Sequence, residues 1–87
     1  MTKRELKRIL KKKTGCAIQH DGWPCGTCFG SLLESLHIDP DSTKAEVLWQ
    51  SLLVYRGDYK LGDIVKLDQV TIDTSIAELK TILTVKG

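Results

Sequence analysis

Residues 20–36 read HDGWPCGTCFGSLLESL, and this stretch decides where a helix can begin in the first half of the chain. Asp21-Gly22 is a turn signal, and Pro24 fits the first turn of a helix because a proline needs no N–H partner there. Cysteine, phenylalanine and leucine then recur at helical spacing, at Cys25, Cys28, Phe29, Leu32, Leu33 and Leu36. The stretch therefore predicts a turn followed by an amphipathic helix that carries a C-x-x-C pair at its start.

Capping boxes, in which Ser or Thr is followed three residues later by Glu, predict three further helices. The pairs are Thr2 with Glu5, Thr43 with Glu46, and Ser75 with Glu78. Gly15 and Gly57 stand where the first and third helices would end, and glycine suits the left-handed cap of a helix. The helix after Thr43 is apolar on most sides, which predicts a central position for it and a buried Trp49.

The predicted fold class is mainly α, a small single domain of about four helices over residues 1–87. Residues 58–72 allow a helical turn, a short strand or both. The alternative is therefore an α+β domain with a short hairpin formed by residues 16–20 and 64–72.

Composition excludes several classes of protein. The chain has 87 residues, a net charge of +2 and three cysteines, and an odd number of cysteines argues against a closed disulfide framework. Its apolar runs are shorter than the roughly 20 residues that cross a bilayer. We therefore expect a cytoplasmic protein without a membrane contact, in which the thiols stay reduced.

Positive charge is concentrated at the N-terminus. Residues 1–13 hold seven of the thirteen Lys and Arg residues and one acid, Glu5. On a helix, six of these cations lie off the stripe of Leu6, Ile9 and Leu10. They are Lys3, Arg4, Lys7, Arg8, Lys11 and Lys12, which together with His20 and Trp23 in the loop 20–24 form the predicted binding surface. Such a surface fits the phosphates of nucleic acid or an acidic protein, and the sequence leaves the two undecided.

Four potential zinc ligands fall within thirteen residues: Cys16, His20, Cys25 and Cys28. Tetrahedral zinc requires all its donors about 2.0–2.3 Å from one ion. If residues 16–20 were extended, Cys16 and His20 would stand about 13 Å apart, so they can share an ion only where this segment turns. The sequence predicts no cofactor, and zinc is the alternative.

Cys25 and Cys28 also permit thiol chemistry. The aromatic residue and the proline just before the pair resemble the active-site turn of thioredoxins, although that family carries its proline between the cysteines. CGTCF at residues 25–29 resembles the papain-type cysteine proteases, which implies a nucleophile at Cys28. That family needs a histidine far downstream, whereas the last histidine here is His37, and a thiol without its base is not an activated nucleophile.

The sequence thus predicts a small binding module without enzymatic activity, which contacts a macromolecule through its basic first helix and loop 20–24. No small-molecule substrate is indicated. The alternative is a small zinc-binding or thiol-redox protein that uses Cys25 and Cys28.

Overall fold

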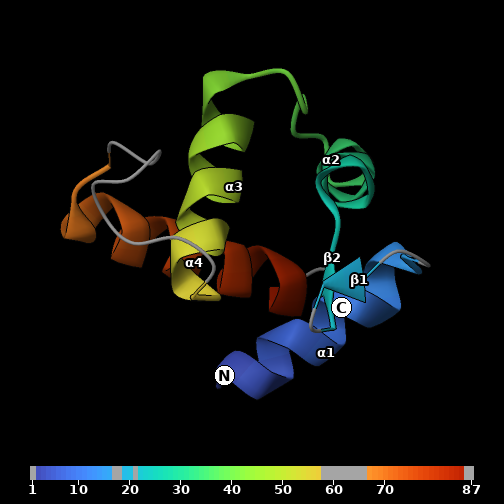
Figure 1. The fold of residues 1–87 in the computed structure, drawn as a ribbon. Coiled ribbons are helices and arrows are strands. Elements are labelled where there is room, and N and C mark those ends of the chain that lie inside the picture. Colours follow the sequence, from blue (N-terminus) through green and yellow to red (C-terminus); the bar gives the residue numbers. More distant parts are fainter. Residues whose placement is uncertain (1, 17–18, 21, 58–66, 86–87) are drawn as a thin grey trace. The chain divides into compact units, whose positions relative to one another are not determined.

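The computed structural model describes residues 2–16, 19–20, 22–57 and 67–85, without the side chains of Gln19, His20 and Val85. Four helices dominate it, which confirms the mainly α fold class. The elements in chain order are α1 (Lys3–Thr14), β1 (Gln19–His20), β2 (Trp23–Pro24), α2 (Gly26–Ser35), α3 (Thr43–Tyr55) and α4 (Gln69–Val85) (Figure 1). Among the described residues, none of these helices has the length and hydropathy of a bilayer-spanning segment.

The chain divides into two compact units, residues 1–45 and 46–87. The first contains α1, both strands and α2, and the second contains most of α3 and all of α4. The single domain over residues 1–87 stays a prediction.

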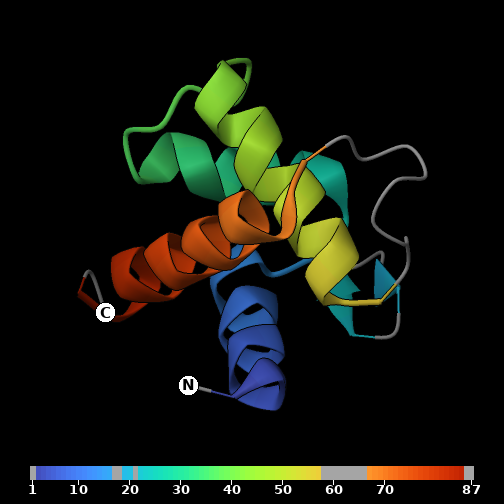
Figure 2. The ribbon, with the colours of Figure 1, turned by 90° about the vertical axis from the view of Figure 1, so that its left-hand side faces the viewer.

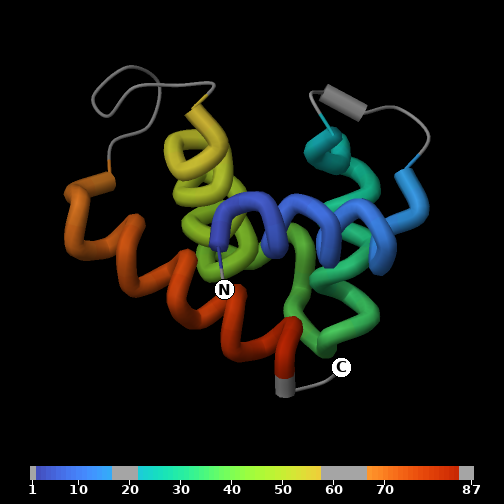
Figure 3. Tube along the Cα trace, turned by 90° about the horizontal axis from the view of Figure 1, so that it is seen from below, coloured from blue at the N-terminus to red at the C-terminus, as the bar shows by residue number. Residues whose placement is uncertain are grey.

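In the first unit, α1 forms as its caps predict. Thr2 Oγ1 accepts a hydrogen bond from the Glu5 N–H at 3.2 Å, and Gly15 closes the helix with a left-handed φ of 60°. Leu6 and Leu10 are fully buried, and α1 contacts both α2 and β2 (Figure 3). The capping residues and the buried leucines thus place the first helix against the segment that contains the C-x-x-C pair.

The start of α2 corrects the sequence interpretation. Pro24 does not enter the first turn of the helix: β1 and β2 pair antiparallel, with Gln19 opposite Pro24 and His20 opposite Trp23. Pro24 is buried in this ladder, so the helix begins two residues later, with Cys25 as its N-cap. The alternative hairpin is also wrong, because β1 pairs with residues 23–24 and residues 69–72 are helical, while 64–66 lie outside the described residues.

Two helix starts in the second half of the chain differ from the predicted capping boxes. The Ala45 N–H donates to Ser42 Oγ at 3.1 Å, so Ser42, one residue before Thr43, supplies the capping oxygen of α3. Asp68 Oδ1 accepts from the Thr71 N–H at 2.8 Å, and α4 therefore begins at Gln69. Ser75, the predicted cap, lies buried inside this helix.

Trp49 is mostly buried but is not among the fully buried residues of α3. Its side chain lies under the Arg56 guanidinium, whose carbon is 5.8 Å from the ring centroid. The buried hydrophobic residues of α3 are Ala45, Leu48 and Leu52, one helical turn apart. Figure 2 shows the course of α3 in green to yellow. In the second unit, Lys80 of α4 places Nζ 5.1 Å from the ring of Tyr55 in α3.

The cap of α4 leads to a prediction about pH. Hydrogen bonds from the Thr71 hydroxyl and then from its N–H hold the pKa of Asp68 below its ordinary value of 3.8. A carboxyl whose pKa is lowered by folding stabilises the fold above its unfolded pKa, and this contribution is lost as the pH falls through the lower, folded pKa. We expect Asp68→Asn to have a lower melting temperature than the wild type at neutral pH, with a difference that shrinks in acid.

Asp73→Asn, which removes the same charge from the same helix, is the matched control. Melting curves of the wild type and both variants, recorded by circular dichroism from neutral pH to well below pH 3.8, make the comparison. A constant difference between wild type and Asp68→Asn at every pH would contradict the prediction.

Candidate metal centre

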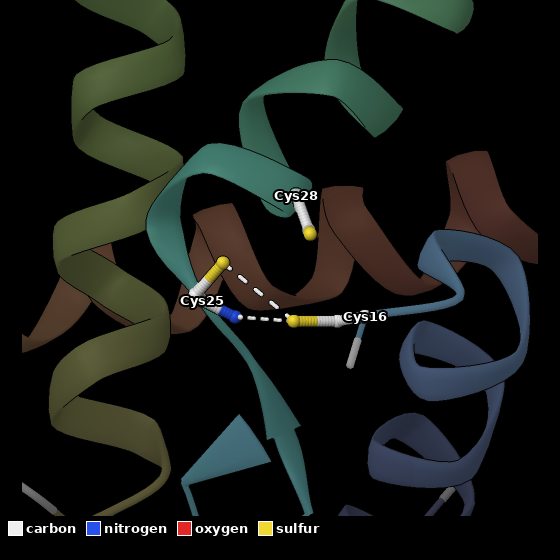
Figure 4. A group of neighbouring side chains, drawn as sticks. All are labelled: Cys16, Cys25 and Cys28. Carbon is white, nitrogen blue, oxygen red and sulfur yellow. Dashed lines mark hydrogen bonds between the residues drawn. The ribbon is translucent and has the colours of Figure 1, made fainter. Parts of the chain in front are cut away.

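Three cysteines meet where α1 ends and α2 begins. Cys16 directly follows Gly15, the left-handed cap of α1. Cys25 is the N-cap of α2, and Cys28 lies three residues further on, in the first turn of that helix. Because β1 and β2 turn the chain back on itself, all three side chains point into one space (Figure 4).

The sulfur atoms are close enough to share one ion. All three Sγ atoms lie within 4.8 Å of one another, and Cys16 Sγ is 3.6 Å from Cys25 Sγ. A tetrahedral ion bound at about 2.3 Å would hold its sulfur ligands about 3.8 Å apart. The cysteines are free thiols, so the three side chains could bind a metal ion.

Hydrogen bonds link these sulfurs to the start of α2, and they favour negative charge at Cys25. The Cys25 N–H donates to Cys16 Sγ at 3.5 Å. The Cys28 N–H at the start of α2, followed by the side chain of Cys16, lowers the pKa of Cys25. The position of Cys25 at the N-terminus of α2 acts in the same direction, because the partial positive charge there stabilises a thiolate.

The third sulfur shows the opposite effect. Its hydrogen bonds with Cys16 and Cys25 raise the pKa of Cys28 to about 12. A thiol next to a thiolate keeps its proton because two adjacent negative charges repel each other. A divalent cation would remove this repulsion, since it attracts all three sulfurs and takes the place of their protons.

Exposure differs among the three thiols. Cys16 is 5% exposed, whereas Cys25 and Cys28 are half-buried. An ion can therefore approach from the side of the C-x-x-C pair, while Cys16 closes the site toward the protein interior.

The two histidines, His20 and His37, differ in their positions relative to the cysteine cluster. The backbone of His20 is in β1, opposite Trp23, but its side chain lies outside the described residues. As a zinc ligand His20 therefore stays a prediction. His37 is exposed beyond the end of α2, in a left-handed conformation with φ of 64°.

The predicted binding surface is only partly at the surface. The side chains of Lys3, Arg4, Arg8, Lys11 and Lys12 are exposed. Trp23 is 3% exposed, so its prediction as a surface residue is wrong. The half-buried side chain of Lys7 covers Trp23, because its Nζ lies 5.7 Å from the centroid of the Trp23 ring. Lys7 also lies against the turn of the hairpin, since a Cβ atom added at Gly22 would be only 3.0 Å from Lys7 Cδ.

Two features escaped the sequence analysis. Lys7 was counted among the surface cations, although it covers the hairpin. The closeness of Cys16 to Cys25 was also not predicted, because nine residues separate them. The Asp21-Gly22 turn was the available signal, since a tight turn there brings the chain on either side of it together.

Comparison of the chain with protein-family models, with curated proteins and with solved structures found no match. Its function is therefore argued from the cysteine cluster and from the surface around it.

Proposed function

We propose that this chain is a small zinc-binding module in which Cys16, Cys25 and Cys28 hold one Zn²⁺ that stabilises the fold. One observation carries the proposal: three Sγ atoms from two separate segments lie within 4.8 Å of one another. Zinc bound by thiolates contributes folding free energy directly, which suits a chain with little core of its own.

The donor set favours zinc over hard cations, and the sulfur spacing favours a single ion over a multi-iron cluster. Thiolates are soft ligands that select zinc, Cu(I) and iron–sulfur clusters, whereas Mg²⁺ and Ca²⁺ prefer oxygen. In a multi-iron cluster different cysteines bind different irons, which separates their sulfurs. The spacing of 3.6 Å between Cys16 and Cys25 instead fits ligands of one ion.

The position of the cluster supports a structural role rather than thiol-redox chemistry. A redox pair needs only Cys25 and Cys28, yet Cys16 lies against Cys25 and accepts its N–H. An ion here would fasten the end of α1 to the start of α2, two segments that the short hairpin connects along the chain. We therefore place the protein among binding modules without enzymatic activity, with the metal as part of the fold.

Titration with Co²⁺, which replaces zinc and is coloured, tests the proposal. We expect one Co²⁺ per chain, with thiolate-to-metal charge transfer and the visible absorption of tetrahedral cobalt, and displacement of the cobalt by Zn²⁺. Cys16→Ser should weaken binding by an order of magnitude or more, because it removes one of only three thiolates. Full binding by Cys16→Ser would favour the redox pair, and absence of any tetrahedral spectrum would overturn the zinc proposal.

The same titration identifies the fourth ligand, with the two histidines as a matched pair. If His20 completes the site, His20→Ala should weaken Co²⁺ binding and shift the visible bands, because water replaces an imidazole nitrogen. His37→Ala should leave both unchanged. Equal binding by the wild type and both variants would show that water or another external ligand takes the fourth position.

A further inference from the structure

We propose that the outer side of α1 binds the phosphate backbone of nucleic acid. Four exposed cations carry this proposal: Arg4, Arg8, Lys11 and Lys12, here called the α1 basic face. The inference does not rest on the zinc proposal, since none of the four is a candidate metal ligand.

The four cations form one continuous array. At about 100° per residue they fall within an arc of about 100°, opposite the buried Leu6 and Leu10. With a rise of 1.5 Å per residue, they extend over about 12 Å along the helix. A linear array of positive charge of this kind is complementary to a linear chain of phosphates.

Helix stability explains only half of these residues. Lys11 and Lys12 lie in the last turn, where the helix dipole favours a cation. Arg4 lies in the first turn, where the dipole disfavours a cation, and like charges four residues apart, such as Arg4 and Arg8, repel each other. The only acid of α1, Glu5, accepts a hydrogen bond from the Thr2 hydroxyl at the start of the helix. The two arginines therefore destabilise the isolated helix slightly, which is expected where a binding surface is retained for function.

The surface fits nucleic acid better than a protein or a membrane. Protein interfaces need apolar or aromatic anchors, and membrane-surface helices need an exposed apolar face. Here Leu6 and Leu10 are buried, and within the described ranges the only exposed large hydrophobic side chain is Val70 in α4. With no aromatic residue in α1 to stack on bases, contacts would be to phosphates and would carry no sequence information.

Fluorescence anisotropy with a labelled DNA duplex of about 20 base pairs tests the proposal between about 50 and 200 mM salt. If four phosphates are contacted, the logarithm of affinity should fall with the logarithm of salt concentration with a slope of about −3 to −4. Two duplexes of unrelated sequence should bind alike.

Lys12→Glu and Lys13→Glu form a matched pair of variants. Both lysines are exposed in the last turn of α1, so the two substitutions have the same effect on net charge and on the helix dipole. Lys13 points about 140° away from Arg8, off the α1 basic face. We expect Lys12→Glu to weaken binding about tenfold or more at 0.1 M salt and to reduce the slope by about one. Lys13→Glu should weaken it only about twofold to threefold, through screened long-range attraction.

Three outcomes would overturn the inference: no binding of DNA or RNA at low salt, equal weakening by the two variants, or binding of anionic lipid vesicles or poly-glutamate without binding of nucleic acid. A Trp49→Phe background supplies the folding control, because Trp23 is then the only tryptophan. Trp23 is buried beside Lys7, so unchanged blue-shifted emission shows that each variant keeps the first unit folded.

Discussion

Removal of zinc is expected to unfold the first unit of the protein. Structural zinc contributes roughly 10–16 kcal/mol of apparent binding free energy in small zinc-finger peptides at pH 7, as much as the roughly 5–15 kcal/mol that stabilises a whole domain. Without the ion, the end of α1 and the start of α2 lose their link. In the Trp49→Phe background, a chelator should shift the Trp23 emission to the red and reduce helical circular dichroism. A fold that needs no cofactor, as the sequence predicts, would show no such change.

Two controls make this experiment specific. Addition of excess Zn²⁺ after the chelator should restore the Trp23 emission, which excludes irreversible damage. Cys28→Ser should bind Zn²⁺ more weakly, so at a Zn²⁺ concentration that just saturates the wild type it should resemble the chelated wild type, and it should need more Zn²⁺ to fold. Identical melting curves with and without chelator would show that the fold needs no metal.

Loss of a buried leucine in α3 is expected to have the second largest effect. Leu52 is 0% exposed, and a Leu→Ala change in such a position costs about 2–5 kcal/mol, because it removes apolar contacts and leaves a cavity. We expect Leu52→Ala to lower the urea midpoint of unfolding strongly, or to prevent folding.

Leu53 is the matched control, because it is the next residue of the same helix and is only half-buried. Leu53→Ala makes the same chemical change with the same effect on helix propensity, so it should cost clearly less than Leu52→Ala. Trp49→Ala should also cost less than the roughly 3–5 kcal/mol of a fully buried aromatic residue. Equal losses for Leu52→Ala and Leu53→Ala would show that the buried face of α3 is assigned incorrectly.

Local sequence signals predicted the helix boundaries correctly where a capping residue marked the boundary unambiguously. Thr2, Glu5 and Gly15 define both ends of α1, and Gly57 follows α3 with a left-handed φ of 92°. The start of α4 was missed because Asp68 caps the helix without a Glu three residues later, so no capping box marks it. The sequence did not show that Leu48 and Leu52 are buried more deeply than Trp49, because a helix that is apolar on most sides does not reveal which side faces the core.

The candidate site was predictable by residue type but not by geometry. Cysteine thiolate is among the few side-chain ligands of zinc, so Cys16, Cys25 and Cys28 could be named as candidates from the sequence. Their convergence depends on the pairing of two very short strands, and ladders of two residues have almost no periodicity to detect. Trp23 was placed on the surface because the sequence does not show that the long side chain of Lys7 folds over the hairpin.

The direct succession of Gly15 and Cys16 has a consequence for cooperativity. Gly15, the C-cap of α1, is one peptide bond from the candidate metal ligand Cys16, so an ion bound by the cluster would couple its occupancy to the order of the end of α1. Thermodynamic linkage is reciprocal. If a bound ion raises the affinity of α1 for a polyanion by a given factor, then a bound polyanion must raise the affinity of the cluster for the ion by the same factor. Through this one junction, the two binding events would act as allosteric effectors of each other.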